Sequence, residues 1–156
     1  MFNENAMNEA IRESEFNKLN GYTMGGPFGA SIVKDGKIIS VAHNTVIETH
    51  DPTAHGEVNA IRKACQALGT HDLSECVLYT SAEPCPMCLS AIIWANIKEV
   101  YFANTRKDTA DIGFKDDDIY EFIKGNNEMI KIAHIENKEA KRIFDEFKEM
   151  NSKKMY

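Results

Sequence analysis

Two closely spaced cysteines constrain this chain more than any other feature. The stretch Pro84-Cys85-Pro86-Met87-Cys88 suits the opening turn of a helix, because proline is favoured at the first helical position and would leave Cys85 as the N-cap. Residues at i and i+3 share a helix face, so both sulfurs point the same way. A helix N-terminus also lowers the pKa of a thiol, and zinc binds the thiolate. The stretch therefore predicts half of a zinc site.

His55 is the best candidate for a third ligand, because a helical pattern begins right beside it. Three protein ligands leave the fourth zinc position open, which is typical of a catalytic site. Glu57, two residues further on, is then the natural proton carrier for a water at that open position. The pattern H-x-E followed by P-C-x-x-C is the signature of zinc deaminases, so the four residues predict a hydrolytic centre.

Two other interpretations of these residues remain open. A structural zinc would need a fourth protein ligand, and His43, His50 and His71 are candidates without a clear ligand spacing. Glu57 taken alone is also a typical acid of a first helical turn, where the helix dipole favours it.

The composition narrows the class of protein. With 156 residues, of which 43% are hydrophobic, we expect one domain over residues 1–156 with its own core, and not a disordered chain. The net charge of −6 and the lack of a basic block argue against a protein that grips nucleic acid. We find no signal peptide, membrane span or lipidation motif in the sequence, so we expect no membrane association.

The cysteines also bear on the compartment. Four cysteines could form two disulfides, but a C-x-x-C pair near His55 and Glu57 favours zinc and a reducing cytoplasm. Cys65 and Cys76 are then expected to be free, small core residues.

Hydrophobic periodicity predicts alternating helices and strands. Helical spacing covers 4–20, 58–68, 85–94, 118–124 and 138–150, and strand patterns cover 28–33, 38–42, 77–80, 100–103 and 129–135. Asp35-Gly36 predicts a hairpin turn. Strands 77–80 and 100–103 flank a helix, so we expect them to be parallel. The predicted fold is a three-layer α/β/α domain with a five-stranded mixed sheet.

With these motifs in view, the chain resembles the zinc-dependent cytidine deaminase superfamily, through His55-Gly56-Glu57 and 84–88. Further segments are similar to the bacterial guanine deaminases within it. They are 26–30, Asn44, 51–55, 60–65, 79–88, Gly113-Phe114 with the acids after it, Ile119-Tyr120 and 153–156. The resemblance covers most of the chain and is weakest over the first twenty residues and from about 125 to 150.

The resemblance implies a cytidine-deaminase-like fold and the hydrolysis of guanine to xanthine and ammonia. One Zn²⁺ per subunit would sit on His55, Cys85 and Cys88. Glu57 would pass a water proton to the purine, and Asp116 would be the second proton shuttle. The partner would be a small purine base, with no nucleic acid.

The resemblance also suggests the residues that hold the substrate. Asn44 would bind the purine, and Phe28, Gly56 and Trp94 would lie beside it. Taken on its own, however, Trp94 is most simply a core residue. Tyr156 would close the pocket of the other subunit, in a homodimer that exchanges a tail of residues 150–156.

Two departures from the family matter. The family usually has Ala where this chain has Gly56, so the backbone beside the substrate is expected to be looser. The acidic run Lys115-Asp116-Asp117-Asp118 also leaves Asp117 as a substitute for Asp116.

Three other functions fit the same residues. A deaminase of this fold could act on cytosine, cytidine, guanosine or an aminotriazine. A tRNA adenosine deaminase would have to flip its base out and should present a basic surface, which a net charge of −6 does not favour. A non-catalytic zinc module would leave Glu57 and the missing fourth ligand unexplained.

Overall fold

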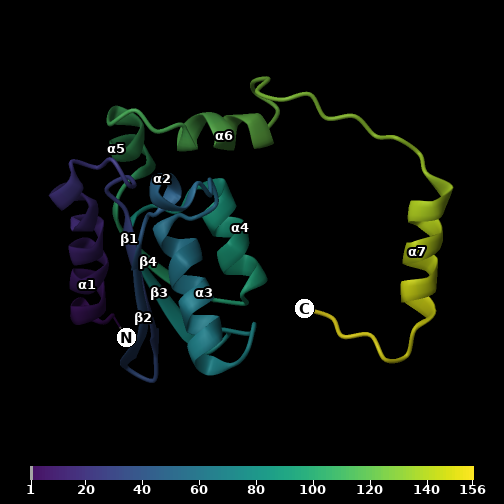
Figure 1. The fold of residues 1–156 in the computed structure, drawn as a ribbon, viewed down its shortest axis with the longest axis horizontal. Coiled ribbons are helices and arrows are strands. Elements are labelled where there is room, and N and C mark those ends of the chain that lie inside the picture. Colours follow the sequence, from purple (N-terminus) through teal and green to yellow (C-terminus); the bar gives the residue numbers. More distant parts are fainter. Residues whose placement is uncertain (1) are drawn as a thin grey trace.

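A mixed sheet of four strands forms the centre of the fold in the computed structural model, which describes residues 2–156 (Figure 1). The strands are β1 (Gly29–Lys34), β2 (Lys37–His43), β3 (Cys76–Ala82) and β4 (Glu99–Asn104), in the spatial order β2-β1-β3-β4. β1 is antiparallel to both β2 and β3, whereas β3 and β4 are parallel.

Local sequence signals account for two of the three strand pairings. The β1–β2 hairpin turns at Asp35 and Gly36, whose φ angles of 50° and 76° are those of the tight turn that Asp-Gly favours. The helix α4 (Pro86–Trp94) connects β3 with β4, and the predicted parallel pairing of these strands is confirmed.

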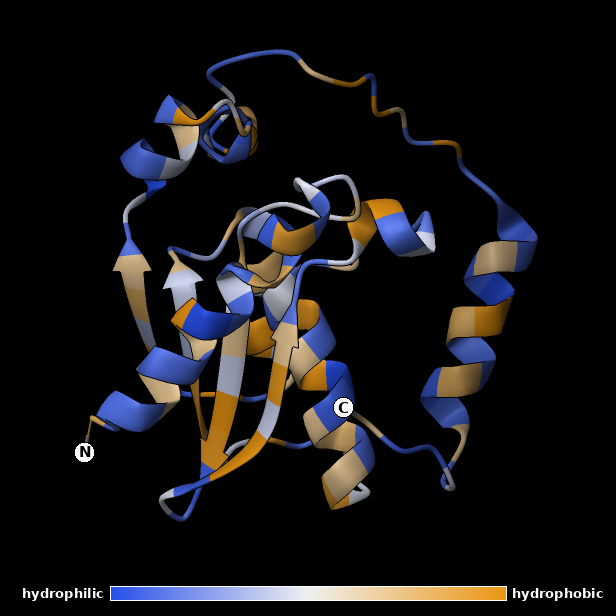
Figure 2. Ribbon diagram, turned by 60° about the vertical axis from the view of Figure 1, so that its left-hand side comes forward, coloured by the Kyte–Doolittle hydropathy of each residue, from blue (hydrophilic) through white to orange (hydrophobic). Residues whose placement is uncertain are grey.

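Helices cover both faces of the sheet (Figure 2). On one face α1 (Glu4–Ser14) buries Ala6 and Ala10 against Val33 and Tyr79. On the other face α3 (Gly56–Leu68) and α4 pack on the alternate residues of the same strands, and this larger core contains Ala30, Ile32, Leu78, Ala60, Ala64 and Ile92. The three-layer α/β/α arrangement is thus confirmed.

The remaining helices are short or lie near the C-terminus. The predicted first helix over 4–20 ends at Ser14 and is followed by a 3₁₀ helix, η1 (Phe16–Asn20). Periodicity did not indicate α2 (Val46–Thr49) or α5 (Arg106–Asp111), because such short helices contain too few turns to show it. α6 (Asp116–Ile123) and α7 (Lys138–Glu149) correspond to the predicted helices.

The predicted fifth strand over 129–135 is wrong for this chain. The described residues form a sheet of four strands, and residues 129–135 form a bend followed by irregular chain, with no strand pairing. Their apolar side chains are exposed, at 65% for Ile130 and 83% for Ile135. Alternation can mark a segment as suited to a strand, but a strand also needs an edge to pair with, and β4 remains an edge strand.

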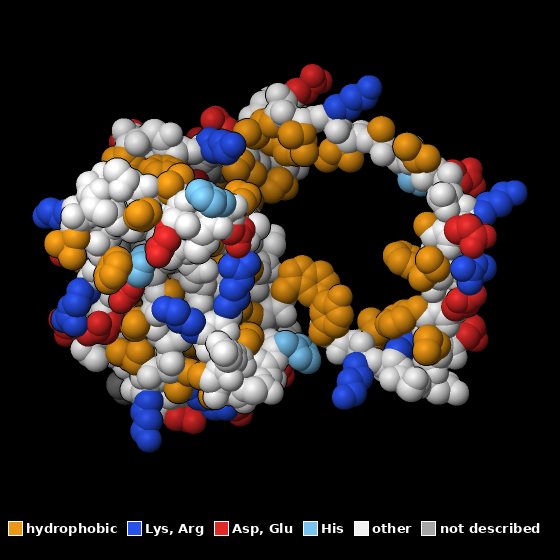
Figure 3. Space-filling view, in the orientation of Figure 1, with side chains coloured by type: hydrophobic (Ala, Val, Ile, Leu, Met, Phe, Trp, Pro, Cys, Tyr) orange, Lys and Arg blue, Asp and Glu red, His pale blue; other side chains and the backbone are white. Residues whose placement is uncertain are grey.

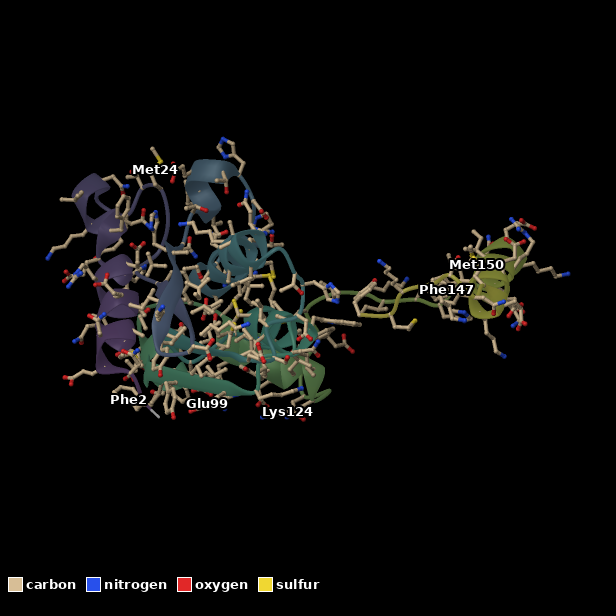
Figure 4. The ribbon with its side chains drawn as sticks, turned by 90° about the horizontal axis from the view of Figure 1, so that it is seen from below. Phe2, Met24, Glu99, Lys124, Phe147 and Met150 are labelled. Carbon is tan, nitrogen blue, oxygen red and sulfur yellow. The ribbon has the colours of Figure 1, made fainter. Side chains whose placement is uncertain are left out.

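Residues 125–156, here called the C-terminal arm, stand away from the sheet and its helices. Figure 4 shows Phe147 and Met150 of the arm well separated from Phe2, Glu99 and Lys124. The chain end then returns toward the helices, where the Tyr156 ring lies 5.7 Å from that of Trp94. Apolar side chains gather on the side of the arm that faces the rest of the molecule (Figure 3), and Ile143, Phe144 and Phe147 of α7 are exposed.

Two further expectations concern the whole chain. All four cysteines are free, with Cys76 buried and Cys65 partly buried, as predicted. Across residues 2–156, no helix combines the length and the hydropathy needed to cross a bilayer.

Candidate metal centre and active site

Two helix N-termini bring the predicted metal ligands together. Cys85 is the N-cap of α4 and Pro86 its first residue, as predicted, and the Cys85 sulfur accepts the Cys88 backbone N–H at 3.5 Å. His55 is the N-cap of α3, with extended backbone angles. The two positive helix ends therefore face one cluster of ligands, which favours thiolates there.

The geometry of this cluster fits zinc. His55 Nδ1 lies 3.6 Å from Cys85 Sγ and 3.5 Å from Cys88 Sγ. Zinc–sulfur and zinc–nitrogen bonds of about 2.3 and about 2.0 Å at a tetrahedral angle require a separation of about 3.5 Å. Within residues 2–156 these three residues are the one group with such spacing. His43 instead pairs with Glu13 at 2.7 Å, so a fourth ligand for a structural zinc is not found among the described residues.

The protonation of the ligands follows from their contacts. The contact with the Cys88 thiol lowers the pKa of Cys85 to about 4, and the same contact raises the pKa of Cys88. A hydrogen bond with Cys85 raises the pKa of His55. A thiolate at a helix N-terminus beside an imidazole is the kind of anionic donor set that a divalent cation neutralises.

Glu57 follows His55 into α3, and its carboxylate is buried beside the ligands. The side chain is 6% exposed, and burial raises the pKa of the carboxyl group. Oε1 accepts the Thr80 hydroxyl at 3.0 Å, and Oε2 lies 3.4 Å from Cys88 Sγ. A carboxyl group with a raised pKa next to an open metal position suits proton transfer near neutral pH.

An open pocket leads to this carboxylate. Its inner part, about 40 Å³, is lined by Phe28, Asn44, His55, Glu57, Ala82, Glu83, Cys85, Phe114 and Asp116. Asn44, His55 and Phe114 also line an outer hollow of about 550 Å³. The Phe28 and Phe114 rings meet edge-to-face at 4.8 Å. The pocket thus offers apolar walls with polar groups at its base, as sites for small planar ligands do.

The orientation of the Asn44 amide is fixed by the backbone around it. Asn44 Oδ1 accepts the N–H groups of Val46 at 3.1 Å and Gly26 at 3.4 Å. The NH₂ end of the amide is therefore the part available to a ligand, which favours a ligand with an acceptor atom.

α6 distinguishes between the two candidate aspartates. Asp116 lines the inner pocket, and burial raises the pKa of its carboxyl group. Asp117 has a side chain that is 56% exposed and pairs with Arg106 at 3.5 Å. This placement favours Asp116 as the residue that meets a ligand.

A small network fastens α6 to the metal-binding loop. The Tyr120 hydroxyl donates to the Pro84 carbonyl at 2.7 Å. The Arg106 guanidinium lies 4.5 Å above the Tyr120 ring, and the Arg106 backbone N–H donates to Glu83 at 2.8 Å. These contacts place Asp116 near Cys85, and Glu83, one of the residues that make them, also lines the inner pocket.

Three of the predicted site residues do not join this pocket in the same way. Gly56 packs on β1, where an added Cβ would meet the Gly29 backbone at 3.1 Å, so the expected looseness is replaced by close packing. Trp94 is 63% exposed at the end of α4, so its assignment to the core is wrong. Tyr156 is 80% exposed and lies against Trp94 and His71, outside the pocket of its own chain.

Other site residues were not predicted from the sequence. Thr80 and Glu83 lie shortly before Cys85 in the sequence. Strand alternation predicts which face of the sheet Thr80 lies on, but it does not indicate that its hydroxyl contacts Glu57. Phe114 was noticed only as part of a resemblance. Asn17, 1% exposed, donates to the Asn44 carbonyl at 2.8 Å, and no sequence pattern indicated it.

Comparison with known proteins agrees with this geometry. The family model described as the cytidine and deoxycytidylate deaminase zinc-binding region matches residues 2–104. A guanine deaminase of Bacillus subtilis (strain 168) is 58% identical over 100 residues, 64% of each chain. A tRNA-specific adenosine deaminase of Aquifex aeolicus (strain VF5) is 52% identical over 77 residues, 49% of this chain and 51% of that protein. These matches span about half to two-thirds of the relatives' lengths.

A solved structure extends the similarity to the whole chain. The X-ray structure of guanine deaminase from Bacillus subtilis superposes with a TM-score of 0.91 and 43% identity, over 100% of this chain and 99% of that one. Identity is thus lower over the full length than the 58% over 100 residues. The fold is thus shared over the whole chain, including the residues after 104, where the zinc-binding family model ends.

Proposed function

This chain belongs to the family of zinc-binding cytidine and deoxycytidylate deaminases, and within that family we propose that it hydrolyses guanine to xanthine and ammonia. The observation that carries the proposal is the similarity to a guanine deaminase over 100% of this chain. It includes residues beyond 104, where the family model ends, and those residues supply Phe114 and Asp116 to the pocket.

The metal of this reaction is one zinc ion per chain, held by His55, Cys85 and Cys88. The ligand separations of 3.5 and 3.6 Å in the structure support it, as does the lowered pKa of the Cys85 thiol. When bound, zinc supplies a water activated as a nucleophile near neutral pH.

Glu57 and Asp116 move the protons. Water adds its oxygen to C2 of guanine, and the bond between C2 and the exocyclic nitrogen breaks. One water proton ends on the ring nitrogen beside C2 and the other leaves in ammonia. Glu57, whose Oε2 faces the ligand set, carries the first proton, and Asp116 across the pocket assists the leaving amine. Burial raises the pKa of both carboxyl groups, so each can hold and release a proton during turnover.

The same pocket selects a flat base with an acceptor atom. Phe28 and Phe114 provide the apolar walls, and the NH₂ group of Asn44 donates to the purine. Guanine carries carbonyl and ring-nitrogen acceptors around its edge, which this donor can use.

The partner is a second copy of the chain. We propose that the C-terminal arm of each copy packs against the other copy. The exposed apolar residues of the arm need a cover, and exchange of an identical element is a low-cost route to a symmetric dimer. Residues 129–135 alternate like a strand, and β4 offers an unpaired edge. The exchanged unit would then be 125–156 and not only the tail 150–156, with Tyr156 covering the outer hollow of the partner. The supporting exposures are 40% for Met129, 76% for Ile132 and 79% for Phe144.

The compartment is the cytoplasm. Four free thiols, two of them in the metal centre, support a reducing environment.

A tRNA adenosine deaminase is the second candidate, because an Aquifex aeolicus enzyme of that name is 52% identical over 77 residues. That similarity covers 49% of this chain, and the net charge of −6 is unfavourable for a polyanion.

An ammonia-release assay separates the candidates. The zinc-loaded protein is offered guanine, guanosine, cytosine, cytidine, adenine, and an adenosine-containing tRNA anticodon stem-loop. We expect guanine to react far faster than every other compound. Preferential deamination of the stem-loop, or of a pyrimidine, would overturn the proposal.

A further inference from the structure

A threonine hydroxyl is buried against the carboxylate of Glu57. Thr80 of β3 is 1% exposed, and its hydroxyl lies 3.0 Å from Glu57 Oε1 and 3.1 Å from the Ala82 carbonyl oxygen. Strand alternation explains the direction, because Leu78 packs in the core beneath α3 whereas Tyr79 packs beneath α1, and Thr80 follows Leu78 on the same face.

The two oxygens of Glu57 consequently have different surroundings. Oε1 is the acceptor of the Thr80 hydroxyl, whereas Oε2 lies 3.4 Å from Cys88 Sγ, among the metal ligands. One oxygen is thus anchored to the sheet and the other faces the site of reaction. Without this contact the two oxygens could exchange places, because rotation about the last bond of a glutamate side chain interchanges them.

From this arrangement we infer that Thr80 is a positioning residue, which fixes Oε1 of Glu57 so that Oε2 is the oxygen that transfers the proton. The inference rests on the proposed function, in which Glu57 is the proton carrier. Thr80 itself is neither one of the three metal ligands nor part of the inner pocket lining. Its contribution comes through orientation, because small misplacements of a catalytic group cost large factors in rate.

A purely structural role for Thr80 makes a different prediction. Valine has nearly the shape of threonine and the same preference for strands, so a packing residue would tolerate Thr80→Val. Serine keeps the hydroxyl but removes the methyl group, so a packing residue would be more sensitive to Thr80→Ser. The two substitutions therefore separate orientation from packing.

The test measures kcat and KM for guanine, zinc content and melting temperature in the full-length, zinc-loaded protein. We expect Thr80→Val to lower kcat about 10- to 100-fold, the usual effect of losing an outer hydrogen-bond partner in such sites, with KM and zinc content nearly unchanged. Thr80→Ser should keep kcat within about threefold of wild type, because its hydroxyl can still donate. Thr109→Val is the matched control, since the hydroxyl of this buried residue donates to the backbone carbonyl of Thr105, at the start of the same helix α5, at 3.3 Å.

A second pair of variants covers a failure of Thr80→Val to fold. Thr80→Ala and Thr80→Ser both remove the methyl branch, and only the alanine variant also removes the hydroxyl. A large kcat loss in the alanine variant alone supports positioning, and equal kcat values in the two variants contradict it.

A double-mutant cycle separates this inference from the function on which it rests. In a Glu57→Gln background, Thr80→Val should cost no further rate, because the proton carrier is already absent. Independent, multiplicative losses would overturn the inference. If Glu57→Gln alone left kcat unchanged, the proposed role of Glu57 would fail. If Glu57→Gln is inactive while Thr80→Val matches wild type, the positioning role alone is wrong.

Discussion

Asn17 lies outside the pocket, yet the structure predicts that its amide supports both stability and substrate binding. Its side chain is 1% exposed, and Nδ2 donates to the carbonyls of Asn44 at 2.8 Å and Gly26 at 3.2 Å. Gly25 lies so close that an added Cβ would come within 2.2 Å of the Asn44 carbonyl. The 3₁₀ helix, the glycine turn and Asn44 are therefore held together by one amide group.

The substitution Asn17→Asp tests this amide at nearly constant volume. It replaces the NH₂ donor by oxygen, which then faces two carbonyl oxygens. Each lost hydrogen bond costs about 0.5–1.5 kcal/mol, and an unsatisfied buried polar group costs about 1–3 kcal/mol. We therefore expect the free energy of unfolding to fall by about 2–4 kcal/mol. For a chain of 156 residues each kcal/mol lowers Tm by about 3 °C, so the expected decrease in Tm is about 6–12 °C.

The functional effect follows from the displacement of Asn44. A loss of about 1.4 kcal/mol in the purine contact raises KM about tenfold. Thermal unfolding followed by circular dichroism and steady-state kinetics with guanine measure the two effects at one protein concentration. Asn137→Asp is the matched control, because the Asn137 side chain is an acceptor at the N-cap of α7 and aspartate caps equally well. If Asn17→Asp changes neither Tm nor KM more than this control does, the Asn17 amide does not support Asn44.

Three further predictions concern the metal, the second carboxylate and the arm. We expect metal analysis to find one zinc per chain, and Cys88→Ala to lose most of it; full occupancy in that variant would exclude Cys88 as a ligand. Asp116→Asn should lower kcat for guanine about 10²-fold or more while zinc content and Tm are retained. Asp117→Asn, on the exposed side of α6, should change kcat little. The reverse result would mean that Asp117, and not Asp116, is the second proton carrier. Deletion of Met155 and Tyr156 should lower guanine turnover but keep zinc and the dimer. Mixing this protein with Glu57→Gln should restore activity once subunits exchange. If exchange is demonstrated and no activity returns, Tyr156 does not act in the pocket of the partner subunit.

The sequence predicted features that depend on neighbouring residues. Pro86 has a fixed φ and no N–H to lose, so Cys85-Pro86 indicated a helix start that the structure confirms. Asp35-Gly36 tolerates positive φ at both positions, and the hairpin forms there. The closeness of Cys85 and Cys88 also follows from local geometry, because residues at i and i+3 share a helix face.

Other features depend on contacts that the sequence does not state. Residues 129–135 have the alternation of a strand, but they form one only if they pair with the edge of a sheet. The four-stranded sheet of their own chain does not include them. Trp94 is apolar, yet it lies on the exposed side of α4 with Leu89 and Ile93 and is itself 63% exposed. Thr80 meets Glu57 across 23 residues of sequence, a contact that periodicity alone cannot indicate.

The most direct test of zinc-dependent guanine hydrolysis is the parallel measurement of xanthine and ammonia from wild type and Glu57→Gln. Glutamine keeps the shape of the side chain and removes its ability to carry a proton. The wild-type protein should release the two products in equal amounts, and the variant should lose a factor of about 10²–10⁴ in kcat with its zinc content and Tm unchanged. Turnover by Glu57→Gln within a few-fold of wild type, or ammonia release without xanthine, would contradict the account.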